Sequence, residues 1–187
     1  MVIINIYMRT YLKSLRARAG FTLIELLVVI GILGVLAAAL IATIDPFEQL
    51  KKAQDANVKN TTVEFVNASI RYYTTHNTLP WADTTAPAAC QNGGTPPSGG
   101  SLTGAQMTSC LNALVTDGEL KTGFTTVTSI LGQVLITGTT NSVTSCFLPQ
   151  SKSQQRDANT KYTSTGGAGV NCVATGGTAT TCYWCAQ

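Results

Sequence analysis

One long apolar run dominates the pattern of hydrophobic and polar positions. Residues 21–44 read FTLIELLVVIGILGVLAAALIATI, and Glu25 is the only charged residue among them. Apolar runs longer than about 18 residues are typical of transmembrane helices. At about 1.5 Å per residue this run reaches about 36 Å, which exceeds a hydrocarbon core of about 30 Å. We therefore predict that the segment crosses a membrane as a helix.

A helical pattern of apolar positions continues after the apolar run. The stripe that it forms contains Phe47, Leu50, Gln54, Val58, Thr61, Phe65, Ala68 and Tyr72. Most charged residues, Asp55 among them, fall on other faces, so the pattern predicts an amphipathic helix that ends near His76. Together the two segments would form one long helix, with Pro46 as the natural position of a bend. The apolar side chains of the stripe must be buried against another element, and a sheet from the C-terminal half is the natural candidate.

Threonine, serine and glycine dominate the chain after Pro80, where the pattern becomes one of short strands and turns. A turn-rich loop is expected over 91–104 and a short helix over 111–115. Strands are predicted over 125–130, 133–138, 142–148 and 180–186, with antiparallel connections at 138–141 and 166–167. The predicted fold class is α+β, with one long N-terminal helix packed on a small antiparallel sheet.

Positive charge is concentrated at the N-terminus. The first twenty residues contain four bases and no acid, namely Arg9, Lys13, Arg16 and Arg18. The positive-inside rule then places the N-terminus in the cytoplasm and the part after the apolar run outside. The remaining eight basic and nine acidic side chains nearly cancel. Because nucleic-acid binding needs a basic patch, no nucleic-acid partner is predicted.

Two features of the N-terminus leave alternatives open. An ordinary signal peptide has a shorter apolar region and ends at small residues, which the alanines at 37–39 resemble. The apolar run here is too long for that class, which makes it the weaker interpretation. Residues 1–7 are apolar, and Met8 precedes a more ordinary polar start. Translation from Met1 and translation from Met8 both remain open.

The junction between the basic arm and the apolar run has the sequence RAGFTLIE, residues 18–25. Glu25 lies one turn inside the apolar run, where a carboxylate costs free energy unless it snorkels to the interface or has a functional partner. The residues from Gly20 to Glu25 resemble the type IV pilin family, which includes the type II secretion pseudopilins. That family has a basic leader ending in glycine, then Phe-Thr-Leu-Ile-Glu and an apolar helix. The resemblance extends from Arg18 to about Tyr73.

The resemblance implies a processing event and an assembly role. A prepilin peptidase would cut between Gly20 and Phe21 on the cytoplasmic side and methylate the new Phe21 amine. Glu25 would then pair with the Phe21 amine of a neighbouring subunit, with Thr22 as a second assembly residue. An unpaired carboxylate or ammonium is expensive in a medium of low dielectric constant, and a pair also fixes the register between subunits.

The family also implies an organisation and a set of partners. Residues 1–20 would be the leader, 21–45 the membrane and filament-core helix, 46–76 the amphipathic helix and 77–187 an extracellular head. The precursor would reside in the cytoplasmic (inner) membrane and then join a pilus, a helical homo-oligomer on the cell surface. A peptidase, an assembly ATPase and a platform protein would be its partners. Neither a cofactor nor an enzymatic activity is implied.

Six cysteines all follow the predicted amphipathic helix: Cys90, Cys110, Cys146, Cys172, Cys182 and Cys185. An extracytoplasmic location favours disulfides, and six cysteines allow fifteen pairings among which sequence does not choose. The pairing that we favour is Cys90–Cys110, Cys172–Cys182 and Cys146–Cys185. Pilins commonly tie their C-terminal loop to the sheet by a disulfide. The C-x-x-C spacing of Cys182 and Cys185 also fits a redox motif, and zinc would need further ligands.

The remaining polar residues give no catalytic or metal-binding pattern. His76 is the only histidine and fits a helix end or surface position, while Asp117 and Glu119 fit an exposed turn. The C-terminal segment has Asp157 as its one acid, which disfavours the calcium loop of many pseudopilins. The sequons at Asn60 and Asn67 fall on the predicted helix and are discounted. Two rivals remain: a pseudopilin for secretion or DNA uptake, and a membrane-anchored binding protein.

Overall fold

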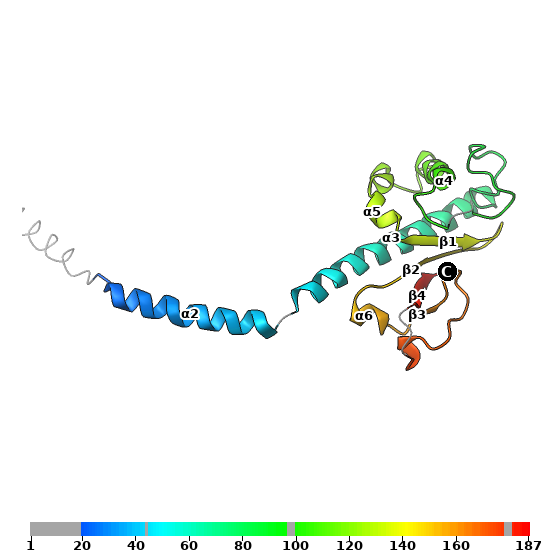
Figure 1. Cartoon of the computed structure of the whole chain (residues 1–187). Coiled ribbons are helices and arrows are strands. Elements are labelled where there is room, and N and C mark those ends of the chain that lie inside the picture. The colour runs from blue at the N-terminus through cyan, green and yellow to red at the C-terminus, as the bar shows by residue number, and fades with distance from the viewer. Residues whose placement is uncertain (1–19, 44, 97–99, 178–180) are drawn as a thin grey trace, which may run out of the picture. The chain divides into compact units, whose positions relative to one another are not determined.

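A computed structural model describes residues 20–43, 45–96, 100–177 and 181–187 (Figure 1). The chain divides into two compact units, one ending at Asp45 and one beginning at Pro46, which are described separately. The elements in order are α2 (Leu23–Thr43), α3 (Pro46–His76), α4 (Ala105–Thr116), the 3-10 helix η1 (Thr122–Thr126), α5 (Thr128–Leu131), β1 (Val134–Gly138), β2 (Val143–Phe147), α6 (Lys152–Gln155), β3 (Thr160–Tyr162), the 3-10 helix η2 (Val173–Thr175) and β4 (Tyr183–Ala186). The predicted α+β fold class is confirmed.

The N-terminal unit contains the apolar helix α2. None of its 21 residues is buried, and by length and composition it could cross a membrane. The predicted continuous helix is interrupted, since α2 ends at Thr43 and α3 begins at Pro46 with Asp45 outside both. Proline has no backbone N–H to donate, and it disfavours helical geometry in the residue before it. The bounds of α3 coincide with those of the predicted amphipathic helix.

The second unit, Pro46–Gln187, includes α3 and is called the head from here on. In it α3 runs along one face of a four-stranded antiparallel sheet (Figure 1). The strand order is β1-β2-β4-β3, so the C-terminal strand β4 pairs on both sides. The face of α3 that meets the sheet contributes to the core, with Val58, Phe65, Val66, Ala68 and Tyr72. Phe147 of β2 and Trp184 of β4 lie opposite each other in the sheet and join the same core.

The N-terminal end of the apolar stripe differs from the prediction. Phe47 and Leu50 are 73% and 62% exposed, so the sheet does not cover them. Burial begins instead at Asp55, which is 3% exposed although the pattern placed it on a solvent face. The first turns of α3 extend past the sheet in Figure 1, which explains why the cover starts late.

The strand predictions were correct for three of the four β-strands. β1 and β2 lie within the predicted ranges 133–138 and 142–148, and β4 lies within 180–186, of which residue 180 is outside the described residues. The strand predicted over 125–130 is wrong, because η1 and α5 occupy this segment. Its threonine hydroxyls bond to carbonyls three residues back, which favours helical turns. β3 was not predicted, since three residues are too few for an alternating signal.

Three disulfides close the head, and they are the three pairings favoured from the sequence. Cys90–Cys110 joins the loop after α3 to α4, Cys146–Cys185 links β2 to β4, and Cys172–Cys182 closes the segment before β4. All six cysteines are at most 8% exposed. Because Cys182 and Cys185 have different partners, the interpretation of their spacing as a redox motif is not supported.

Candidate functional site

The start of α2 is capped by two of the residues singled out from the sequence. The Thr22 carbonyl accepts the Leu26 N–H at 3.2 Å, which makes Thr22 the residue that caps the helix. The Thr22 hydroxyl accepts the Glu25 N–H at 3.3 Å. In return the backbone N–H and the hydroxyl of Thr22 donate to Oε2 of Glu25 at 2.9 and 2.8 Å. This reciprocal arrangement is a capping box.

The capping box gives Glu25 a role that sequence reasoning missed. A threonine followed three residues later by a glutamate, before an apolar run, is the sequence signature of this motif. The apolar surroundings of Glu25 in the sequence indicate only that the carboxylate snorkels to the interface or has a functional partner. Both bonds end on Oε2, and Oε1 has no hydrogen bond within the described part of the chain. The helix start therefore orients the carboxylate and leaves one oxygen available.

Apolar side chains surround that carboxylate on one face of the helix. Phe21, Ile24, Glu25, Val28 and Val29 line a shallow surface depression. They recur at helical spacing, and Phe21 is 89% exposed. A single acid with an apolar rim suits a partner that is itself apolar and carries one positive group, because the rim excludes water from the ion pair.

The head contains a buried carboxylate of its own, at Asp55 of α3. Its oxygens accept the Gln150 N–H at 3.0 and 3.1 Å, the Ser151 N–H at 2.7 Å and the Ser151 hydroxyl at 2.6 Å. About two turns earlier on α3, Glu48 accepts the backbone N–H of Lys152. The two acids fasten the segment between β2 and α6 to the helix. This cluster is an internal brace rather than an open site.

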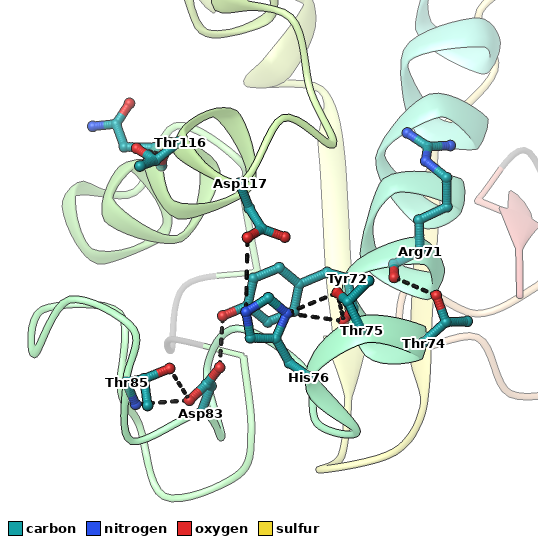
Figure 2. Close-up of polar contacts among 10 residues, drawn as sticks. Arg71, Tyr72, Thr74, Thr75, His76, Asp83, Thr85, Thr116 and Asp117 are labelled. Carbon is teal, nitrogen blue, oxygen red and sulfur yellow. Dashed lines mark hydrogen bonds and ion pairs between the residues drawn. The ribbon is translucent and has the colours of Figure 1, made fainter.

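A third polar cluster lies at the C-terminal end of α3 (Figure 2). The Tyr72 hydroxyl donates to Asp83 at 2.7 Å, and Asp83 also accepts the backbone N–H and the hydroxyl of Thr85. The His76 ring stacks on Tyr72 with 4.0 Å between centroids, and its Nε2 lies 3.7 Å from Asp117. His76 ends the helix, as the sequence indicated. The cluster ties three segments together.

Burial and hydrogen bonding act in opposite directions on the pKa values of this cluster. Burial raises the pKa of the Tyr72 hydroxyl, and its bond to Asp83 raises it further. Burial on its own would raise the pKa of Asp83. The hydrogen bonds from Thr85 and Tyr72, with the nearby His76, outweigh it and leave that pKa below its ordinary value.

Stability in acid is expected to depend on Asp83. Because folding lowers its pKa, its contribution is complete above the unfolded value of about 3.9 and is lost as the pH falls through the lower folded value. We expect Asp83→Asn to flatten the acid side of the stability profile. Urea unfolding of the full chain in detergent, followed from about pH 6 to about pH 2, measures this. An unchanged slope would contradict the assignment.

Two ion pairs also connect α3 to the rest of the head. Arg71 binds Glu119 at 2.6 Å and donates to the carbonyl of the same residue. Glu119, which the sequence placed in an exposed turn, thus has a basic partner on the helix. Lys59 lies 3.5 Å from Asp157 and 4.7 Å from the ring centre of Trp184. Both pairs join α3 to residues far from it in the sequence.

The sequence-predicted site residues fall into two groups. Gly20, Phe21, Thr22 and Glu25 lie together at the start of α2, while the cysteines are distributed through the head. The basic residues of the predicted leader lie outside the described residues.

The two sequons on α3 have buried hydroxyl residues. Thr62, which completes the sequon of Asn60, and Ser69, which completes that of Asn67, are both 0% exposed. Each hydroxyl donates to a carbonyl of the same helix. That burial agrees with discounting the sequons.

Comparison with known proteins identifies the same N-terminal region. Residues 15–41 match the family model described as the prokaryotic N-terminal methylation motif, the signature of type IV pilins and pseudopilins. No curated protein and no solved structure matches the chain. The match includes the Gly20–Phe21 dipeptide, the capping box and most of α2. The head has no counterpart in these comparisons.

Proposed function

We propose that this chain, which carries the N-terminal methylation motif, is the structural subunit of an extracellular type IV pilus. The observation that carries the proposal is the start of α2. A carboxylate is oriented by Thr22 within an apolar face, five residues after the glycine at which the motif is cut. An acid in this position can form an ion pair when a positive group from another subunit approaches it.

Processing would supply that group. Hydrolysis of the Gly20–Phe21 peptide bond leaves a carboxylate on Gly20 and a free amine on Phe21, which is then methylated and stays cationic. The amine of one subunit would approach Oε1 of Glu25 in the next, while Thr22 of the second subunit keeps Oε2. The pair would neutralise both charges inside an apolar filament core and set the stagger between subunits.

Assembly would transfer α2 from lipid to a bundle of identical helices. All of its large apolar side chains are exposed in the single chain, so the helix needs an apolar environment throughout. The contact is heterologous, because the amine of one copy meets the acid of another, and a heterologous contact that does not close generates a filament. The threonine- and serine-rich head would form its outer surface.

Mass analysis of filaments sheared from cells tests the proposal. We expect the mature chain to begin at Phe21, to carry one added methyl group and to contain all its cysteines in disulfides. A mature chain that retains its arginine-rich N-terminus would contradict the proposal, because it would have no Phe21 amine. That outcome would favour a membrane-anchored binding protein.

The methylation motif also occurs in pseudopilins, so a secretion or DNA-uptake pseudopilus is the alternative. Both alternatives share the processing step and the amine–carboxylate pair. Deletion of the gene separates them. Loss of long surface filaments with normal secretion and DNA uptake would support the pilus, and the reverse phenotype would support the pseudopilin.

The capping box makes a prediction at Thr22. Thr22→Val keeps the shape of the side chain but removes the hydroxyl that bonds Glu25, whereas Thr22→Ser keeps the hydroxyl. Loss of such a cap costs about 1 kcal/mol, so we expect the valine variant to lower filament yield about fivefold. Sheared filaments quantified against total processed subunit measure the effect.

The serine variant is the control for that prediction. If the hydroxyl orients Glu25, Thr22→Ser should retain filament yield while Thr22→Val does not, with cleavage and membrane insertion equal in both. Equal yields from the two variants would show that the hydroxyl has no part in assembly.

A further inference from the structure

Two large apolar side chains are exposed at the start of α3. Phe47 and Leu50 are 73% and 62% exposed, and they lie three positions apart on one side of the helix. Asp55, which the head buries, lies about 80° from Phe47 and about 140° from Leu50 around the helix. The sheet therefore leaves a small apolar face, formed by Phe47 and Leu50, at the N-terminal end of α3.

Chain length places this apolar face close to the membrane. Thr43 is the last residue of α2, and Phe47 follows four positions later. Four residues span at most about 14 Å, so Phe47 cannot lie far from the end of the apolar helix. The headgroup layer occupies roughly 5–7 Å on each side of the hydrocarbon core. The face is therefore within reach of the lipid headgroups.

The charges around the apolar face suit a lipid surface. Lys51 is exposed and lies about 40° from Phe47 around the helix, whereas Lys52, also exposed, lies about 160° from Leu50 on the opposite side. Of the nearby acids, Glu48 accepts the backbone N–H of Lys152 and so faces the head. Asp45 lies on the other side of Pro46, outside the helix. Apolar side chains beside a lysine are typical of helices that contact the headgroup region of anionic membranes.

We propose that Phe47 and Leu50 insert into the headgroup layer of the membrane that α2 crosses, with Lys51 bound to an anionic headgroup. The inference rests on the proposed membrane residence of α2 and adds a second lipid contact, made by the head. This contact would keep the head of the unassembled subunit at a fixed distance from the membrane surface. It must be released when the subunit enters a filament.

Tryptophan fluorescence in lipid nanodiscs tests the contact. The full chain with Phe47→Trp, or with Leu50→Trp as a second variant, is placed in discs of phosphatidylethanolamine and phosphatidylglycerol with bromine near the headgroup end of the acyl chains. The native Trp81 and Trp184 are 0% and 6% exposed and serve as a shielded background. Val63→Trp is the matched control, because Val63 is exposed but lies about 24 Å further along α3 than Phe47.

We expect the Phe47→Trp and Leu50→Trp chains to lose fluorescence with brominated lipid and to emit at shorter wavelength, whereas Val63→Trp does neither. Adding Lys51→Gln should reduce the loss in discs that contain phosphatidylglycerol, whereas Lys52→Gln, on the opposite side of the helix, should not. Equal loss with and without Lys51 would overturn its role as a headgroup ligand. A shift to shorter wavelength without quenching by brominated lipid, which grows with the number of chains per disc, would indicate that a second copy covers these residues. That result would overturn the proposal.

Protease protection of α2 in the same discs separates the two hypotheses. If α2 is inserted and neither tryptophan variant is quenched, the lipid contact of the head is overturned while membrane residence stands. If α2 is not inserted, both are overturned. None of these measurements requires filament assembly.

Discussion

Glu25→Ala is expected to abolish filament formation while the protein is still inserted and cleaved. Removing one partner of a buried ion pair costs about 3–5 kcal/mol, because the remaining charge is left uncompensated. At each subunit contact this corresponds to an association weaker by roughly a hundredfold or more. The variant also loses the Oε2 acceptor of the capping box, which satisfies Thr22 in the wild type. Electron microscopy and immunoblots of sheared material measure the yield.

Two variants make this experiment specific. Glu25→Gln keeps a side-chain acceptor for the capping box but removes the charge, so it should also fail to assemble if pairing with the amine matters more than helix capping. Glu64→Ala removes an exposed glutamate from α3 and should assemble normally. Wild-type filament yield from Glu25→Ala would reject the pairing role of Glu25.

The N-terminal region could be predicted from sequence because its signals are local. The apolar run, the basic arm and the motif from Gly20 to Glu25 each occupy adjacent residues, and helix formation depends on contacts within one or two turns. Even the capping box could have been predicted from Thr22 and Glu25, three positions apart. Pro46 predicted a bend at the position where the structure shows an interruption between α2 and α3.

The head was less predictable because its decisive contacts join distant residues. Asp55 and Ser151 are 96 positions apart, and nothing near Asp55 in the sequence shows that it will be buried. The stripe from Phe47 to Tyr72 predicted the face of α3 that meets the sheet, but not where the sheet stops. In the segment before β1, threonines with high strand propensity form helical turns instead, where hydroxyls bond to carbonyls three residues back.

The brace at Asp55 explains how a sheet with few residues holds a long helix. β2 and β4 pack on α3, and the segment after β2 returns to the helix through Asp55 and Glu48. The loop from Pro149 to Lys152 donates three successive backbone N–H groups to these two acids. Carboxylates that accept backbone N–H groups satisfy donors that would otherwise be buried without partners.

Asp55→Ala is therefore expected to destabilise the head more than any exposed substitution on the same helix. It leaves the Gln150 and Ser151 N–H groups without their acceptor, at about 1–3 kcal/mol for each buried donor. We expect a loss of about 3–5 kcal/mol in the free energy of unfolding, a large share of the roughly 5–15 kcal/mol typical of a domain. Urea unfolding of the full chain in detergent, with disulfides intact, measures the loss.

The control for Asp55→Ala is Glu64→Ala, nine positions along the same helix and exposed, which should change stability by no more than about 0.5 kcal/mol. Ser151→Ala removes the hydroxyl bond of 2.6 Å to Asp55 and the acceptor of the Gln154 N–H at the start of α6, and should lie between the two. This order follows from counting the donors that lose their acceptor. Asp55→Ala strands three of them, Ser151→Ala strands one, the Gln154 N–H, and Glu64→Ala strands none. An Asp55→Ala head as stable as Glu64→Ala would mean that the segment finds other acceptors and that Asp55 does not brace α3 against the rest of the head.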